Sequence, residues 1–275
     1  MKAEEKLKHL KETLTKMGSV LIAYSGGVDS TFLASVASEV LGQRAMVVFA
    51  HSPIYPPHEC EDAETLARKL GFRFTTIETN ELENPQFVAN SPDRCYYCKQ
   101  ELFQQLRRIA SAEGLDWIAD GSNYDDLGDY RPGRKALAEL GIRSPLCEVE
   151  LTKDEIRRLS KKRGLPTWDK PASPCLASRI PYGTPVTRDT LRRIGDGERY
   201  LRNLGIRECR LRHHENIARI EVNGKGMSLL LNGQIRQDLV KQIKALGYTY
   251  VTLDLGGYRS GSLNEELIGD VEERK

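Results

Sequence analysis

A repeated strand, turn and helix pattern constrains the fold of this chain more than any other feature. An apolar run at residues 19–24 is followed by a glycine turn and by a helical pattern at 30–41, which ends near Gly42. The alternation continues with expected strands at 45–50, 72–77 and 117–119 and expected helices at 57–70 and 94–113. Because helices alternate with strands, we expect an α/β fold, a Rossmann-like open parallel sheet covered by helices.

The glycine turn after the first expected strand reads Ser25-Gly26-Gly27-Val28-Asp29-Ser30. Two glycines let the backbone approach an anion closely, and free amides at a helix start donate hydrogen bonds to it. The segment is therefore predicted to bind phosphate. It lacks the lysine of the GxxxxGK motif, which disfavours transfer of a γ-phosphate. The simpler alternative is that Asp29 or Ser30 only caps the helix.

In open parallel sheets the ligand lies beyond the carboxyl ends of the strands. The turns after Tyr24, Ala50 and Ala119 should therefore face one cleft. The last of them, Asp120-Gly121-Ser122-Asn123, is by itself only a turn signal. Asp29 and Asp120 are candidate Mg²⁺ ligands. The predicted nucleotide-binding residues are Ser25, Gly26, Gly27, Asp29, Ser30, Ala50, Gly121 and Ser122.

The composition indicates a folded protein that does not depend on nucleic acid or a membrane. Lys and Arg number 41 against 39 acidic residues, and a net charge of +2 provides no strong field for nucleic acid. The first residues show no signal peptide, and no apolar stretch approaches the roughly 20 residues needed to cross a bilayer. We therefore expect a cytoplasmic protein whose six cysteines are thiols, thiolates or metal ligands.

The second part of the chain has a different pattern. A helix is expected at 152–163, and a segment rich in proline and glycine follows it. Later residues suggest helices at 187–204 and 235–246 and strands at 208–212, 218–222 and 248–253. The expected organisation is a nucleotide domain at 1–170, a cysteine-bearing loop at 171–185, a small α+β domain at 186–257 and a mobile tail at 258–275.

Three cysteines lie in suggestive positions. Cys95 and Cys98 are three residues apart at a helix start, and Cys175 lies four residues before Arg179, whose charge should favour ionisation of the thiol. Three thiols suit an iron–sulfur cluster with one open iron, whereas structural zinc needs a fourth ligand. The pair could also be packed apolar residues or a redox disulfide.

Two arginines of the second part, Arg210 and Arg212, alternate along an expected strand and so point to the same side. This arrangement is suited to bind a phosphate group. The alternative is that both arginines form the solvent face of an edge strand.

The SGGxDS loop resembles that of the PP-loop ATP pyrophosphatases, which implies cleavage of ATP to AMP and pyrophosphate. Together with RCYYCK at 94–99 and PCLASRIPYGTPVT at 174–187, it resembles the LarE family of sulfur transferases over nearly the whole chain. This resemblance implies thiolation of a pyridinium biscarboxylic acid mononucleotide, on the way to the nickel-pincer nucleotide cofactor of lactate racemase. It also implies a homo-oligomer.

The resemblance implies roles for individual residues. Cys175, Ser178, Arg179 and Glu198 match catalytic positions, and Arg179, Arg210 and Arg212 match the substrate phosphate site. Family members either consume one cysteine, leaving dehydroalanine, or hold a 4Fe-4S cluster with three. Cys95, Cys98 and Cys175 match the cluster pattern, and Cys175 also matches the consumed residue. ATP, Mg²⁺ and a 4Fe-4S cluster are the expected cofactors.

Three other functions are compatible with the phosphate loop. A tRNA thiolase should show a basic appended surface, and a GMP or NAD synthetase needs no trio of cysteines. A nucleotide-binding module without turnover would need the same loop as an enzyme.

Overall fold

The computed structural model describes residues 2–128, 132–259 and 263, which form two compact units. Unit 1 comprises Met1–Phe87 and Ser91–Ser173, and unit 2 comprises Val88–Asn90 and Pro174–Lys275. The predicted mobile tail at 258–275 lies almost entirely outside the described residues. In the described part of the chain, no helix is both long and apolar enough to span a bilayer.

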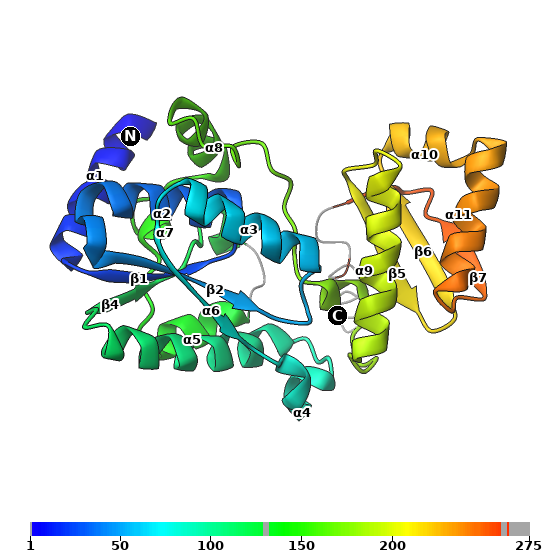
Figure 1. The fold of residues 1–275 in the computed structure, drawn as a ribbon, viewed down its shortest axis with the longest axis horizontal. Helices are drawn as coiled ribbons and strands as arrows, with labels where there is room; N and C mark the ends of the chain where they lie inside the picture. The colour runs from blue at the N-terminus through cyan, green and yellow to red at the C-terminus, as the bar shows by residue number, and fades with distance from the viewer. Residues whose placement is uncertain (1, 129–131, 260–262, 264–275) are drawn as a thin grey trace, which may run out of the picture. The chain divides into compact units, whose positions relative to one another are not determined.

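Unit 1 is built on a four-stranded parallel sheet in the order β3-β2-β1-β4 (Figure 1). Its strands are β1 (Val20–Tyr24), β2 (Ala45–His51), β3 (Arg73–Glu78) and β4 (Trp117–Ala119). This arrangement, with a smaller C-terminal domain, confirms the predicted fold class. The chain runs from β1 outward to β3 and then returns to place β4 on the other side of β1. The order of the strands therefore reverses between β1 and β4, where open sheets bind their ligands.

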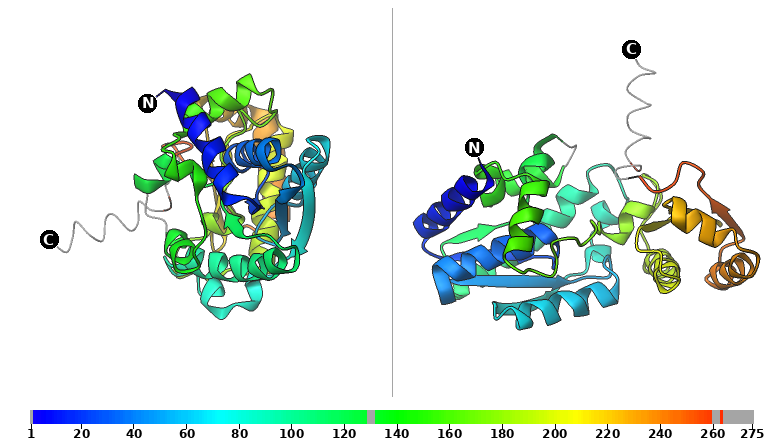
Figure 2. Two further views of the ribbon diagram at one scale, coloured as in Figure 1. Left: turned by 90° about the vertical axis from the view of Figure 1, so that its left-hand side faces the viewer. Right: turned by 90° about the horizontal axis from the view of Figure 1, so that it is seen from above.

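Helices cover both faces of this sheet, as the views in Figures 1 and 2 agree. One face carries α1 (Ala3–Met17), α2 (Val28–Leu41), α3 (Pro57–Lys69), α7 (Pro145–Glu148) and α8 (Lys153–Lys162). The opposite face carries α5 (Arg94–Ala112) and α6 (Gly133–Glu139). Along β1, Val20 and Ile22 pack in the first core and Leu21 in the second. Because successive strand residues point to opposite faces, a strand buried on both sides is apolar throughout.

Unit 2 contains a three-stranded sheet in the order β5-β6-β7. β5 (Cys209–His214) pairs antiparallel with β6 (Ile217–Val222), which pairs parallel with β7 (Tyr250–Leu253). The helices are α9 (Arg188–Asn203), α10 (Gly224–Leu230) and α11 (Gly233–Ala245). A Cβ built on Gly197 of α9 would lie 2.3 Å from Leu211 and 3.4 Å from Ile243 of α11. Leu211 therefore faces the helices, and its neighbours Arg210 and Arg212 occupy the other face of the sheet.

Every predicted strand and long helix has a counterpart within two residues at each end. The short elements were not predicted, because they contain too few residues to show a helical period of apolar side chains. They are α4 (Pro85–Val88), α6, α7, α10 and the 3₁₀ turns η1 (Gly42–Arg44), η2 (Glu81–Glu83), η3 (Tyr124–Gly128) and η4 (Leu176–Arg179).

Candidate functional site

The predicted phosphate loop lies at the carboxyl end of β1, directly before α2. Gly27 has an extended conformation (φ −83°, ψ 177°) and is the N-cap residue of the helix. Ser30 Oγ lies 3.0 Å from Ser25 Oγ and accepts a hydrogen bond from the Ser25 amide at 3.2 Å. The loop therefore closes on itself through two hydroxyl groups and brings them to the positive end of the helix dipole.

Gly26 is in the left-handed region with a φ of +66° and packs tightly on α3. A Cβ at this position would lie 2.6 Å from the Cβ of Ala63, which is closer than real side chains approach. Both the conformation and the space therefore require glycine here. The motif predicts that its glycines serve the backbone conformation of the loop, and Gly26 does so.

The turn after β4 lies against the phosphate loop, as expected for neighbouring parallel strands. A Cβ on Gly121 would be 3.0 Å from the Ser30 backbone nitrogen. The Asp120 carboxylate accepts hydrogen bonds from Ser144 Oγ at 2.6 Å, from the Ser122 amide at 3.2 Å and from Ser122 Oγ at 2.5 Å. Because both of its oxygens have partners, Asp120 acts in this structure as the anchor of the turn.

Asp29 differs from Asp120, because one of its oxygens remains open. Lys153 Nζ contacts Asp29 Oδ2 at 2.5 Å, whereas Oδ1 is buried and accepts no hydrogen bond from the described residues. Burial raises the pKa of the Asp29 carboxyl, and the Lys153 charge opposes that rise. A buried carboxylate oxygen without a donor, beside a phosphate-binding loop, fits a Mg²⁺ ligand.

Two lysines next to the loop were not predicted as site residues. Lys153 is the first residue of α8, placed there by a capping box between Thr152 and Glu155. Lys170 donates a hydrogen bond from Nζ to the Gly26 carbonyl at 3.1 Å, and Arg157 binds the Lys170 carbonyl at 2.9 Å. The sequence contained one indication of such lysines, because the loop lacks the lysine of the GxxxxGK motif. That absence does not predict which distant lysine lies beside the loop.

Ala50, the remaining residue of the predicted nucleotide site, is half-buried near the end of β2. It pairs with Ile77 of β3, and the next residue, His51, contacts Glu64 at 2.5 Å through Nε2. β2 is the neighbour of β1 on the side away from β4, so Ala50 lies at the same edge of the sheet as the phosphate loop.

The cysteines predicted to bind metal lie in different units. Cys95 is exposed and Cys98 half-buried in the first turns of α5 in unit 1. Cys175 is half-buried in unit 2, directly before η4. Across the described ranges, no three His, Cys, Asp or Glu side chains converge into a metal-binding group. None of the six cysteines, all of which lie in the described ranges, forms a disulfide.

The other three cysteines have environments that favour the neutral thiol. Burial raises the pKa of Cys60, Cys147 and Cys209 to about 11 in each case. Neighbouring carboxylates add to this effect, with Glu59 beside Cys60 as one example. Since a metal ligand must be a thiolate, these three are poorly suited to that role.

Arg179 and Glu198 form a buried pair in unit 2. Arg179 Nε lies 2.8 Å from Glu198 Oε1 and its Nη2 lies 3.0 Å from Oε2, with both side chains at most 1% exposed. Burial by itself opposes ionisation of Glu198, but Arg179 holds the pKa of this carboxyl below its ordinary value. Arg179 also donates to the Cys175 carbonyl at 3.0 Å and to Ser178 Oγ at 2.9 Å. The guanidinium charge is therefore already balanced by Glu198.

Arg210 and Arg212 lie on one face of β5, as predicted, but they are buried. Arg212 contacts Glu221 through two bonds of 3.0 and 3.1 Å and donates to the Ser178 carbonyl at 2.6 Å. Arg210 donates to the Tyr258 hydroxyl at 3.0 Å. Burial, followed by the charge of Arg179, lowers the pKa of Arg210. The alternative of a solvent-facing edge is therefore wrong, because the two side chains belong to a buried charged cluster.

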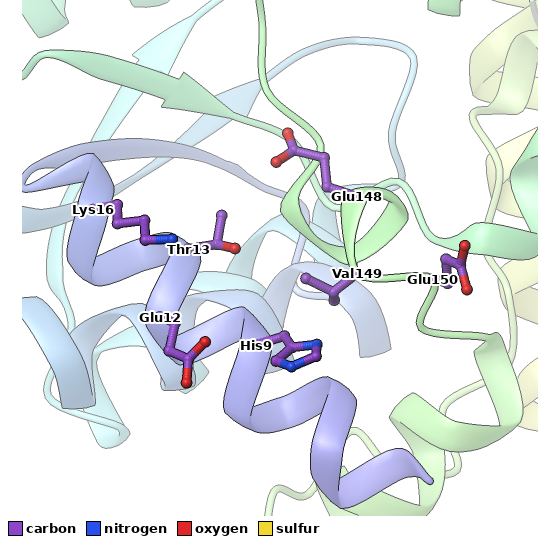
Figure 3. A pocket seen from close by; sticks show the side chains of 7 residues that line it. All are labelled: His9, Glu12, Thr13, Lys16, Glu148, Val149 and Glu150. Carbon is purple, nitrogen blue, oxygen red and sulfur yellow. The ribbon is translucent and has the colours of Figure 1, made fainter. Parts of the chain in front are cut away.

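A separate hollow of about 380 Å³ lies between α1 and the segment that follows α7 (Figure 3). Its lining mixes both charges with one apolar side chain, and the residues are His9, Glu12, Thr13, Lys16, Glu148, Val149 and Glu150. It contains none of the predicted site residues, which lie instead at the carboxyl ends of the strands, at the start of α5 and in unit 2.

Comparison with known proteins agrees with this arrangement. A family model described as NAD synthase matches residues 3–100. An uncharacterized protein of Synechocystis sp. is 47% identical over 264 residues, which cover 96% of this chain and 98% of that protein. A GMP synthase of Aeropyrum pernix is 30% identical over 188 residues, which cover 62% of this chain but 36% of that enzyme. The match to the family model thus includes the predicted phosphate loop.

One relative of known activity matches along almost its full length. The pyridinium-3,5-bisthiocarboxylic acid mononucleotide synthase of Lactiplantibacillus plantarum is 38% identical over 257 residues, or 92% of each chain. The match therefore extends over both units. The chain thus belongs to the LarE family of PP-loop sulfur transferases and is an ATP-utilising enzyme of that type.

Proposed function

We propose that this enzyme adenylates the carboxylates of pyridinium-3,5-biscarboxylic acid mononucleotide and converts them to thiocarboxylates, a step in nickel-pincer nucleotide biosynthesis. The proposal is supported by the match to the L. plantarum synthase, whose name gives the thiolated product. The observation that carries it is the phosphate loop, which has no lysine of its own and has an unpartnered Asp29 oxygen at the helix start.

The nucleotide step depends on unit 1. The amides and hydroxyls of the loop hold the β and γ phosphates. The open Asp29 oxygen would hold Mg²⁺, which when bound would neutralise charge on the phosphates. A substrate carboxylate oxygen then attacks the α-phosphorus while the bond to the β-phosphate oxygen breaks. The products are an acyl-adenylate and pyrophosphate, and AMP is a good leaving group for the next step.

The sulfur step depends on the cysteines. In the simplest version the Cys175 thiolate attacks the acyl carbon, and the bond from that carbon to AMP breaks. Loss of the Cys175 α-proton and cleavage of its Cβ–S bond then leave a thiocarboxylate on the substrate and dehydroalanine in the chain. Each enzyme molecule that reacts this way transfers one sulfur.

The alternative that we favour uses Cys95, Cys98 and Cys175 as ligands of a 4Fe-4S cluster, which when bound supplies a sulfide instead of the cysteine sulfur. Support comes from the spacing of the three residues and from the exposure of Cys95. The described residues contain no preformed metal-binding group, so this assignment rests on the cysteine pattern. Burial raises the pKa of Cys60, Cys147 and Cys209 to about 11, which makes these three less suited to be ligands.

The substrate phosphate is assigned to the charged cluster of unit 2. Arg179, Arg210 and Arg212 supply three guanidinium groups, and Glu198 holds Arg179 in place through two bonds. Ser178 joins the two halves of the cluster, because its hydroxyl accepts from Arg179 and its carbonyl accepts from Arg212. We further propose a cytoplasmic homo-oligomer that uses no nucleic acid.

The test is to incubate anaerobically purified enzyme with Mg·ATP and the biscarboxylic acid mononucleotide, and to measure pyrophosphate, thiolated product and the mass of the Cys175 peptide. We expect pyrophosphate and AMP only when the substrate is present. Loss of about 34 Da from this peptide, the mass of H₂S, would identify Cys175 as the consumed donor. Formation of ADP, or absence of pyrophosphate with every acyl acceptor, contradicts the proposal.

A further inference from the structure

Asn90 lies in a short segment of unit 2 that the chain reaches before the rest of that unit. Residues Val88–Asn90 belong to unit 2 although the residues on both sides of them belong to unit 1. Asn90 is fully buried and has a φ of +53°, in the left-handed region that few residues other than glycine adopt. A buried polar residue in this conformation persists only where its surroundings hold it firmly.

The side chain of Asn90 holds the loop that follows η4. Its Nδ2 donates to the carbonyls of Pro181 at 2.7 Å and Thr184 at 2.9 Å, with a longer contact of 3.4 Å to Ile180. The backbone continues the connection, because the Gly183 amide donates to the Asn90 carbonyl at 3.0 Å. One residue thus holds the loop at 180–184 through its side chain and its backbone.

This loop starts where the proposed sulfur site ends. Arg179 is the last residue of η4, and the Ile180 amide donates to the Ala177 carbonyl within the same turn. Ser178 also donates its amide to the Cys175 carbonyl, so the segment from Cys175 to Thr184 is one continuous hydrogen-bonded structure. We therefore expect a shift of the loop at its far end to move Cys175.

We infer that Asn90 is a positioning residue for sulfur transfer: it fixes the segment that carries Cys175, Ser178 and Arg179. The inference rests on the proposed function, because it assigns those residues to the sulfur step. Binding of Mg·ATP does not depend on this clamp, because the phosphate loop, Asp29 and Lys153 all belong to unit 1. Asn90 should thus affect the steps that use the substrate and spare nucleotide binding.

Asn90→Gly tests this inference, because glycine adopts the same left-handed conformation but has no side-chain donor. Asn90→Asp is the second variant, since aspartate also tolerates this conformation but presents an acceptor to three carbonyls. The control is Asn216→Gly, the same substitution at an exposed position of unit 2. Two quantities are measured on the full-length protein: the Kd for Mg·ATP, by calorimetric titration without substrate, and the rate of thiocarboxylate formation.

We expect Asn90→Gly and Asn90→Asp to lower the kcat for thiolation about 10- to 100-fold, as misplacement of a reacting group by about 1 Å does. The Kd for Mg·ATP should remain at the wild-type value, and the Asn216→Gly control should match wild type in both measurements. Equal thiolation by Asn90→Gly and wild type would overturn the inference. So would a parallel loss of ATP binding, which indicates general destabilisation. Failure of the wild type to bind ATP or to thiolate the substrate would instead contradict the proposed function.

Discussion

Lys153 Nζ lies 2.5 Å from Asp29 Oδ2, although 124 residues separate the two in the chain. The contact leaves Oδ1 as the open, buried oxygen beside the phosphate loop. The backbone amide of Lys153 also donates to Asp125 Oδ2 at 2.8 Å. One residue of α8 thus joins the motif carboxylate to the segment that follows β4.

Replacing Lys153 with methionine should weaken binding of the metal–nucleotide complex. Burial already raises the pKa of Asp29, and loss of the Lys153 charge would raise it further. The carboxylate would then be protonated, and metal binding lost, at a higher pH than in wild type. We expect about 10-fold weaker Mn²⁺·ATP binding near neutral pH, as for loss of a charged hydrogen bond.

Electron paramagnetic resonance of Mn²⁺ across a pH series measures this change without turnover. Lys162→Met is the matched control, because Lys162 belongs to the same helix but pairs with the exposed Glu4. Identical binding curves for Lys153→Met and wild type would show that the ion pair does not support the metal site.

Gly26→Ala should abolish nucleotide binding because it changes both the conformation and the packing of the loop. The new Cβ would lie 2.6 Å from Ala63 Cβ, and the φ of +66° is unfavourable for alanine. Gly18→Ala is the control, since Gly18 has a φ of +73° but open space around it. Calorimetric titration with ATP should show no binding to Gly26→Ala and near wild-type binding to Gly18→Ala. If Gly18→Ala lowered ATP binding as much as Gly26→Ala, the loss of binding could not be attributed to the contact between residue 26 and α3.

Glu198→Gln should destabilise unit 2 in a pH-dependent way. The pKa of Glu198 is lowered in the folded state, so its charge stabilises the fold above the ordinary value of 4.5, and this contribution is lost as the pH falls through the folded pKa. Removing one partner of a buried pair costs about 3–5 kcal/mol. The difference in free energy of unfolding from wild type should be largest near neutral pH and shrink below about pH 4.

Urea unfolding of unit 2, followed from about pH 3 to pH 7, measures this difference. Glu208→Gln provides the control, because the exposed Glu208 carboxylate only accepts a hydrogen bond from Asn223. A constant difference across the pH range would contradict a role for the Glu198 charge.

Single serine variants of the three proposed cluster ligands should lose most of their iron. Cys95→Ser, Cys98→Ser and Cys175→Ser each remove one of the thiolates that a three-cysteine site needs. Cys147→Ser is the control, because burial raises the pKa of Cys147 to about 11 and serine can keep its hydrogen bond to the Asn123 carbonyl. Iron and acid-labile sulfide after anaerobic purification are the readouts. Full iron content in Cys175→Ser would favour the version in which Cys175 is consumed.

The architecture of unit 1 was predictable because its signals are local. Apolar runs such as Val20–Tyr24, and the glycines that follow them, are sufficient to place the strands and the phosphate loop. Likewise, alternation along β5 correctly predicted that Arg210 and Arg212 share a face. Their burial was not predictable, because it depends on partners elsewhere, Glu221 for Arg212 and Tyr258 for Arg210.

The sequence by itself thus determined the sheet, the glycine turn and the family, since these follow from neighbouring residues and motifs of fixed spacing. The tertiary structure decided which charges meet: Lys153 with Asp29, and Lys170 with the Gly26 carbonyl across 144 residues. It also decided that Asn90 holds the loop beyond Arg179. Contacts of this kind have no local period or motif, because they arise only when folding brings distant segments together.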